Sequence, residues 1–129
     1  MISVHETLQL HETLIEAFGG ASGVRDSGAL KSALERPFQT FASVDLYPDP
    51  LEKASALIES ILINHPFIDG NKRTGYALMR LYLLSRNFDI SASQDAKYLF
   101  VIDVASGQVR FEEILHWLQN HTVKLQTGI

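Results

Sequence analysis

The sequence predicts an all-α protein. Apolar residues recur every three or four positions along most of the 129 residues, which is the spacing of one face of a helix. Glycine, proline and capping residues separate these periodic stretches. One segment, residues 38–50, is rich in aromatic, β-branched and turn-forming residues instead. We therefore expect a single domain over residues 1–129, a helical bundle with one small hairpin-like loop.

Two helices are expected in the first part of the chain. The apolar spacing over residues 4–18 predicts a first helix, which a pair of glycines brings to an end. A short second helix over residues 29–35 can be capped by Asp26 or Ser27, and a proline prevents it from continuing. Residues 38–50 are then expected to form an irregular or hairpin-like loop.

Four further helices are expected, over residues 51–64, 71–86, 93–105 and 111–121. The stretch from Tyr76 to Leu84 is apolar on nearly every side of its helix. Such a helix is normally buried, so this one is expected to run through the middle of the domain. Its charged exception is Arg80, which we expect to pair with a buried carboxylate or to reach the loop that precedes the helix.

The composition excludes several classes of site. Without cysteine, disulfides, thiolate chemistry and zinc–cysteine centres are ruled out. No apolar run is long enough to cross a bilayer and no signal peptide is read, so a cytoplasmic protein without a membrane partner is expected. A net charge of −4 argues against direct binding of nucleic acid. His5 and His11 lack the spacing of a zinc pair and are expected to be surface or half-buried.

The helix start after residue 70 breaks a local rule. Lys72 and Arg73 stand in the first turn, where the helix dipole disfavours cations. A bound anion would remove this conflict. Gly70 allows a sharp turn and a close approach of the backbone, and the amides that follow point outward. Gly70, Asn71, Lys72 and Arg73 are therefore candidates for a phosphate-binding site.

His65 and Asp69 bracket the loop that leads to this helix. A histidine can take a proton from an attacking hydroxyl near neutral pH. A carboxylate beside bound phosphates suits Mg2+, which prefers oxygen ligands. Together these are the parts that phosphoryl transfer requires. A simpler interpretation is also open, in which Asp-Gly-Asn is an ordinary turn and Asp69 only caps the helix.

Residues 65–73 read His-Pro-Phe-Ile-Asp-Gly-Asn-Lys-Arg, which closely resembles the signature of the Fic/Doc superfamily in its death-on-curing (Doc) form. The likeness covers most of the chain. The segment from Gly19 to Pro37 resembles the family's leader, and Val104–Gly107 with Trp117–Leu118 resembles its tail. The resemblance implies a Fic fold, in which a helical bundle surrounds a buried central helix and carries a small flap.

The same resemblance implies a role for each residue of the loop. His65 would be the general base for a target hydroxyl, and Asp69 would hold Mg2+. The others fall into pairs: Pro66 and Phe67 pin the loop to the core, Gly70 and Asn71 form the anion hole, and Lys72 and Arg73 bind the phosphates of ATP.

Two departures from the commoner AMP-transferring Fic proteins concern the reaction. Those proteins have glycine at the position of Lys72 and a second arginine at the position of Tyr76. The resemblance therefore implies a Doc-type toxin that transfers the terminal phosphate to a protein hydroxyl, with a translation factor such as elongation factor Tu as a target. AMP transfer (AMPylation) and an inactive module that only binds an antitoxin are the alternatives.

The segment ahead of residue 50 is a candidate for target docking. Thr40, Phe41, Val44 and Tyr47 favour extended backbone. In Fic proteins the matching segment is a flap that aligns the target chain, and an exposed strand edge can do so by main-chain hydrogen bonds. We expect a short hairpin or extended loop over the cleft that holds His65. The alternative is a plain connection between helices.

Regulation by a second polypeptide is expected as well. Many Fic enzymes are restrained by a glutamate on an inhibitory helix, and the near match in this chain is Ser55 to Glu59. That match lies in the helix leading into the catalytic loop, which is not the place of the inhibitory helix. The resemblance thus implies a separate antitoxin, similar to the prevents-host-death partner of Doc.

Overall fold

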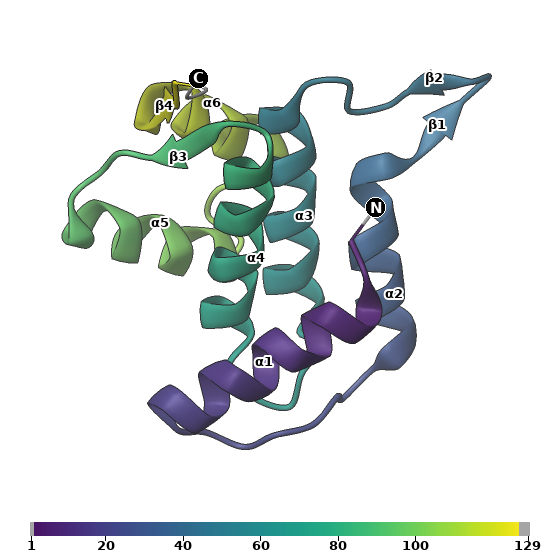
Figure 1. The fold of residues 1–129 in the computed structure, drawn as a ribbon, viewed down its shortest axis with the longest axis vertical. Helices are drawn as coiled ribbons and strands as arrows, with labels where there is room; N and C mark the ends of the chain where they lie inside the picture. Colours follow the sequence, from purple (N-terminus) through teal and green to yellow (C-terminus); the bar gives the residue numbers. More distant parts are fainter. Residues whose placement is uncertain (1, 127–129) are drawn as a thin grey trace.

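The computed structural model describes residues 2–126, and a pair of helices forms its centre. α3 (Pro50–Asn64) and α4 (Asn71–Ser85) lie side by side (Figure 1) and are joined by a short loop. Gly75 permits their close approach, because a Cβ atom placed on it would lie 2.9 Å from Leu62 Cδ2. The connecting loop therefore stands at one end of the helix pair.

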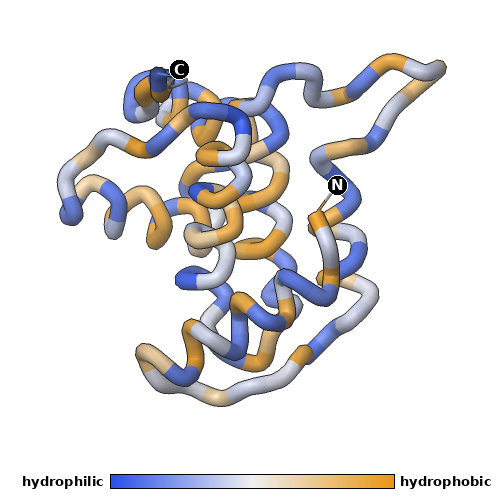
Figure 2. The backbone as a smooth tube through the Cα atoms, in the orientation of Figure 1, coloured by the Kyte–Doolittle hydropathy of each residue, from blue (hydrophilic) through white to orange (hydrophobic). Residues whose placement is uncertain are grey.

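Four more helices surround this pair: α1 (Val4–Phe18), α2 (Ser27–Glu35), α5 (Gln94–Ala105) and α6 (Phe111–His121). A 3-10 turn, η1 (Arg36–Phe38), follows α2. The helices contribute to one hydrophobic core or pack against it, and Figure 2 shows the hydrophobic positions along α3 and α4. The predicted all-α class is confirmed, and each predicted helix is found within two residues of its expected ends. None of the helices in residues 2–126 has the length and hydrophobicity needed to cross a membrane.

Capping side chains set the starts of four helices. Ser3, Asp26, Asp49 and Ser93 each accept a hydrogen bond from a backbone amide in the first turn of the following helix. Such caps satisfy amides that have no partner inside the helix. The second helix is thus capped by Asp26, the first of the two residues that the sequence offered.

α4 lies at the centre as expected, but α3 is the more buried helix of the pair, so the expectation that residues 71–86 form the most buried helix is wrong. The run from Ala54 to Leu62 is buried throughout, whereas Leu81 of α4 is 52% exposed. The sequence does not reveal the burial of α3, because the charged residue Glu59 in the middle of this helix suggests an exposed position. That carboxylate is 5% exposed and binds Arg36 at 2.8 Å and Arg110 at 3.0 Å, and these partners make its burial possible.

Within residues 2–126, two small antiparallel sheets accompany the helices. β1 (Thr40–Phe41) and β2 (Val44–Asp45) form the hairpin that the sequence favoured. Its turn residues have positive φ, as two-residue hairpin turns require. The second sheet, in which β3 (Phe88–Ile90) pairs with β4 (Thr122–Lys124), was not predicted.

Candidate active site

α3 ends at Asn64, and its C-cap is His65, whose backbone turns into the left-handed region with φ 48° and ψ 61°. Its amide still donates to Ile61 O at 3.2 Å, so the last turn of α3 closes at this residue. A left-handed conformation costs a residue other than glycine about 1–2 kcal/mol, and surrounding contacts must stabilise it. The exposed side chain of His65 lines a cleft at this end of the molecule.

The rest of the loop is held from inside the protein. Pro66 is buried, and Phe67 is 1% exposed and belongs to the hydrophobic core. The side chain of Asn71 closes the loop, because its Nδ2 donates to Phe67 O at 3.0 Å and its Oδ1 accepts from Phe67 N at 2.9 Å. The Asn71 side chain is thus used internally, and only its backbone amide is left for an anion.

Asp69 presents an exposed carboxylate that stays ionised. Its Oδ2 accepts from Ala21 N at 3.1 Å and its Oδ1 from Gly70 N at 2.8 Å. These two hydrogen bonds, with a smaller contribution from the charge of Arg73, hold the pKa of the Asp69 carboxyl below its ordinary value. The amide of Gly70 already donates to this carboxylate, so it is not available to an anion. Gly70 therefore contributes to the expected anion hole only through the turn of its backbone.

The first turn of α4 presents three amides. Gly70 is the N-cap, with φ 75°, and Thr74 is the first residue whose amide donates to a carbonyl of the same turn, Gly70 O, at 2.9 Å. The amides of Asn71, Lys72 and Arg73 are the unpaired donors that every helix start carries. Together with the positive end of the helix dipole, they form an anion-binding group.

Two cations flank these amides. Lys72 is exposed and lines the cleft. Arg73 lies over the ring of Phe18, with its guanidinium carbon 4.6 Å from the ring centroid. That contact holds Arg73 beside α1 while its charge remains close to Asp69.

His11 is the residue of the site that the sequence misplaced. The expectation of a surface or half-buried side chain is wrong, since His11 is 1% exposed. Its ring stacks on Phe67 with centroids 4.0 Å apart, and its Nε2 donates to Asp69 O at 2.8 Å. His11 therefore links α1 to the loop. One sequence feature could have predicted this burial: His11 lies in the apolar stripe of the first helix.

The segment between α1 and α2 runs along the loop like a short strand. Val24 and Phe67 form an isolated antiparallel bridge, and Ile68 N donates to Gly23 O at 3.1 Å. The side chain of Arg25 reaches the main chain of residues 64 and 65. The contact joins positions about 40 residues apart in the chain, so no local sequence pattern marks it.

A cleft of about 610 Å3 brings these groups together. One wall consists of loop and α4 residues, namely His65, Ile68, Asp69, Gly70, Asn71, Lys72, Arg73 and Tyr76. The opposite wall is α5, through Gln94, Lys97, Tyr98, Val101 and Ile102, none of which the sequence had marked. The cleft therefore has a charged end at the loop and a more apolar wall on α5.

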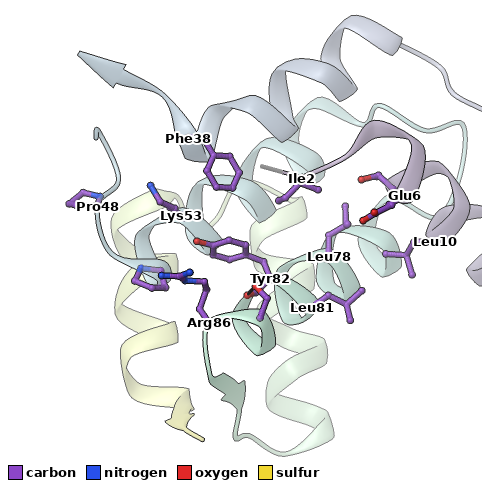
Figure 3. Close-up of a pocket in the computed structure, with 13 residues that line it drawn as sticks. Ile2, Glu6, Leu10, Phe38, Pro48, Lys53, Leu78, Leu81, Tyr82 and Arg86 are labelled. Carbon is purple, nitrogen blue, oxygen red and sulfur yellow. Dashed lines mark hydrogen bonds between the residues drawn. The ribbon is translucent and has the colours of Figure 1, made fainter. Parts of the chain in front are cut away.

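A second cavity, of about 490 Å3, lies between α1, α3 and α4 (Figure 3). Phe38, Lys53, Tyr82 and Arg86 are among its lining residues, and no residue of the loop takes part. Burial raises the pKa of Tyr82, which favours its neutral form. This cavity holds none of the groups that the sequence assigned to the chemistry.

The hairpin does not lie over the cleft. β1 and β2 project from the start of α3, at the opposite end of that helix from the loop (Figure 1). A helix of 15 residues separates the two places by about 22 Å. Tyr47 packs against Phe111 and binds Arg36, while Thr40, Phe41 and Val44 are exposed. The expectation of a flap over His65 is therefore wrong, because the chain enters α3 at its far end.

The structure places two further residues of α4, of which Arg80 is the one with two expected partners. Arg80 forms a two-pronged ion pair with Asp89, at 2.9 and 3.1 Å, and so pairs with a partly buried carboxylate.

Tyr76 lines the cleft, and its hydroxyl is buried with no hydrogen-bond partner among the described residues. Burial raises the pKa of Tyr76, so the hydroxyl keeps its proton at neutral pH.

Comparison with known proteins identifies the family to which this arrangement belongs. Residues 1–83, from α1 into α4, match the Fic/DOC family. The chain belongs to that family. It is 36% identical over 118 residues to Toxin Doc of Mycolicibacterium smegmatis, covering 87% of this chain and 88% of the relative. It is 25% identical over 118 residues to Protein kinase doc of Escherichia phage P1, covering 92% of each chain.

Membership in the Fic/DOC family supports a nucleotide-using transferase, and the residues fit the metal that such chemistry uses. In residues 2–126 no three metal-binding side chains cluster, so a protein cage for an ion is absent there. Mg2+ needs less, since it is commonly held by one or two carboxylates together with phosphates and waters. Asp69 meets this need, because each of its oxygens accepts one amide and keeps a lone pair.

Proposed function

We propose that this protein is a Doc-type toxin that transfers the terminal phosphate of ATP to a hydroxyl of a target protein. The observation that carries the proposal is the shared cleft. In it, His65, the Asp69 carboxylate and the amide-bearing start of α4 with Lys72 line one cavity. A base, an ionised carboxylate and an anion site in one place are what phosphoryl transfer requires.

His65 is the proposed base. It takes the proton of the target hydroxyl as that oxygen attacks the γ-phosphorus of ATP. The bond between the γ-phosphorus and its bridging oxygen breaks, and ADP leaves with the electron pair of that bond. The products are ADP, a phosphorylated hydroxyl and a protonated His65, which returns its proton to water.

The phosphates are held at the start of α4. The amides of residues 71–73 donate to phosphate oxygens, and Lys72 and Arg73 balance their charge. Asp69 would hold Mg2+, which neutralises charge on the phosphates when bound. Phosphate at this position also relieves the unfavourable placement of two cations at a helix start.

The wall formed by α5 fits the rest of the nucleotide. Tyr98 is 68% exposed, and Val101 and Ile102 line the same side of the cleft. An exposed aromatic ring beside aliphatic side chains suits the face of a nucleobase. In this arrangement the charged loop holds the phosphates and α5 holds the nucleoside.

Transfer of AMP is the second candidate, and two residues favour phosphate instead. Lys72 and Tyr76 stand where the resemblance to AMP-transferring Fic proteins leads one to expect glycine and arginine. The relative from phage P1 is named a protein kinase, which supports the same choice. An inactive binding module is less favoured, because it has no need of an ionised Asp69 beside an anion site.

Two protein partners are proposed, one as the substrate of the reaction and one as its inhibitor. A translation factor such as elongation factor Tu is the proposed target, and a separate antitoxin is the proposed restraint. Both relatives carry the Doc name and one is called a toxin, which supports an antitoxin partner. Glu59, the near match to an inhibitory glutamate, binds Arg36 and Arg110 inside the fold and so has a structural role.

The test of this proposal is His65→Ala, assayed by transfer of label from γ-labelled ATP to protein in a bacterial lysate. Loss of a general base should lower the rate by about a hundredfold or more. Because His65 is exposed, the thermal unfolding temperature should stay close to that of the wild type. Transfer at the wild-type rate by a folded His65→Ala protein would refute the assignment.

A further inference from the structure

Arg25 holds the main chain on both sides of the bond that joins α3 to the loop. Its Nε donates to His65 O at 2.7 Å, and its Nη2 donates to Asn64 O at 2.5 Å. The backbone amides of Arg25 and Asp26 both donate to Pro66 O, at 2.8 and 3.0 Å. Three consecutive carbonyls, of residues 64, 65 and 66, are thus held from two neighbouring residues.

The contact of the Arg25 guanidinium with the carbonyls of residues 64 and 65 forms at the protein surface. Arg25 is exposed, and the planar fork of its guanidinium matches two carbonyls that diverge at a helix end. Carbonyls at the end of a helix have no amide partners within it and carry the negative end of the helix dipole. A cation at this place therefore satisfies the end of α3 and stabilises the left-handed turn at His65.

The residues on both sides of Arg25 fix the position of its backbone. Asp26 Oδ1 accepts from Ala29 N at 2.9 Å and caps α2, so the position after Arg25 is tied to a helix. Val24, the position before it, pairs with Phe67. Both neighbours are thus held independently of the guanidinium.

We infer that Arg25 is the positioning residue of His65. By fixing the main chain of residues 64–66, it sets the direction in which the His65 side chain enters the cleft. The inference rests on the proposed function, because Arg25 would affect the reaction only through His65, the proposed base. A residue that only caps α3 would change stability without a specific effect on turnover.

The experiment compares Arg25→Gln and Arg25→Lys with Asp26→Ala, a matched control that removes a helix cap one residue away. Arg25→Gln should lower kcat for γ-phosphate transfer by between about tenfold and a hundredfold, as small misplacements of a base do, with little change in KM for ATP. Arg25→Lys should recover part of the loss, because an ammonium can reach a carbonyl but lacks the fork. Asp26→Ala should lower the unfolding temperature and keep kcat near the wild-type value.

Two kinetic results would overturn the inference. One is a kcat for Arg25→Gln no lower than that of Asp26→Ala. The other is a raised KM for ATP with an unchanged kcat, which would make Arg25 a ligand of the nucleotide.

A second measurement does not depend on activity. In protein labelled with 15N-histidine, the His65 amide should become more mobile in Arg25→Gln, and it should keep its wild-type order in Asp26→Ala. An equally rigid amide in Arg25→Gln would refute the inference. If the wild type transfers no phosphate, the proposed function fails, and this measurement still decides the role of Arg25.

Discussion

Gly20 shows how closely the segment after α1 approaches the site. Its φ is +116°, and a Cβ atom placed on it would lie 2.8 Å from Asp69 Oδ2. Such a contact must displace the carboxylate that accepts from Ala21 N. The glycine pair was read from the sequence as the stop of a helix, and its second member also makes room for Asp69.

Gly20→Ala should therefore lower the rate of phosphate transfer by about tenfold or more, because it moves the proposed Mg2+ carboxylate. The control is Gly19→Ala, at φ +88° with no atom within 4 Å of the added Cβ. It carries a similar backbone strain and should reduce stability alone. Transfer rates and unfolding temperatures of both variants check this, and equal rates in the two would contradict the placement of Asp69.

At the scale of residues, the sequence predicted what lies in one continuous stretch and missed what the fold brings to it. The groups from His65 to Arg73 were expected in one site, and most of them line one cleft. His11 and Arg25 reach the same loop from 58 and 40 residues away, respectively. Contacts of this kind leave no local pattern, because they depend on how α1 and its following segment pack.

At the scale of elements, the distance between α3 and α4 depends on Gly75. A Cβ at this position meets Leu62 Cδ2 at 2.9 Å and Ile61 Cγ2 at 3.1 Å, and both side chains are fully buried. We expect Gly75→Ala to lower the free energy of unfolding by about 1–3 kcal/mol through overpacking. Gly28→Ala, with its nearest contact at 3.5 Å, should be neutral or slightly stabilising. Urea unfolding of both proteins checks the prediction, and similar midpoints would contradict it.

The six helices in the described part of the chain were predictable because each combines a periodic apolar face with a start or stop signal. The β3–β4 sheet was not, since two three-residue strands from distant parts of the chain pair without any turn between them. The hairpin was predictable as a local structure, but its position was not. Its place relative to the cleft is set by the direction of α3, which local sequence does not show.

At the scale of the whole molecule, Glu59 ties α3 to two distant segments. It binds Arg36 at the end of α2 and Arg110 at the start of α6. Burial opposes ionisation of Glu59, but the hydrogen bonds and charges of the two arginines outweigh it. They hold the pKa of the carboxyl below its ordinary value of 4.5.

A lowered pKa in the folded state means that the ionised form stabilises the fold. This stabilisation is present above the ordinary pKa and is lost as the pH falls through the lowered one. Glu59→Gln should therefore lower the free energy of unfolding by about 1–3 kcal/mol at pH 7. The difference from the wild type should shrink below about pH 4. Urea unfolding at pH 7 and at pH 3 checks this, and a difference that does not depend on pH would show that the charge of Glu59 is unimportant.

The cleft is proposed to deliver the terminal phosphate of ATP to a protein. The most direct measurement incubates the protein with a bacterial lysate and ATP that carries label in either the α- or the γ-phosphate, followed by mass analysis of the labelled protein. Transfer of the terminal phosphate should give γ-label alone and a mass increase of one phosphate group on a hydroxyl-bearing residue, and both should be absent with His65→Ala. Transfer of α-label with the mass of AMP would contradict it and establish the AMP-transfer alternative.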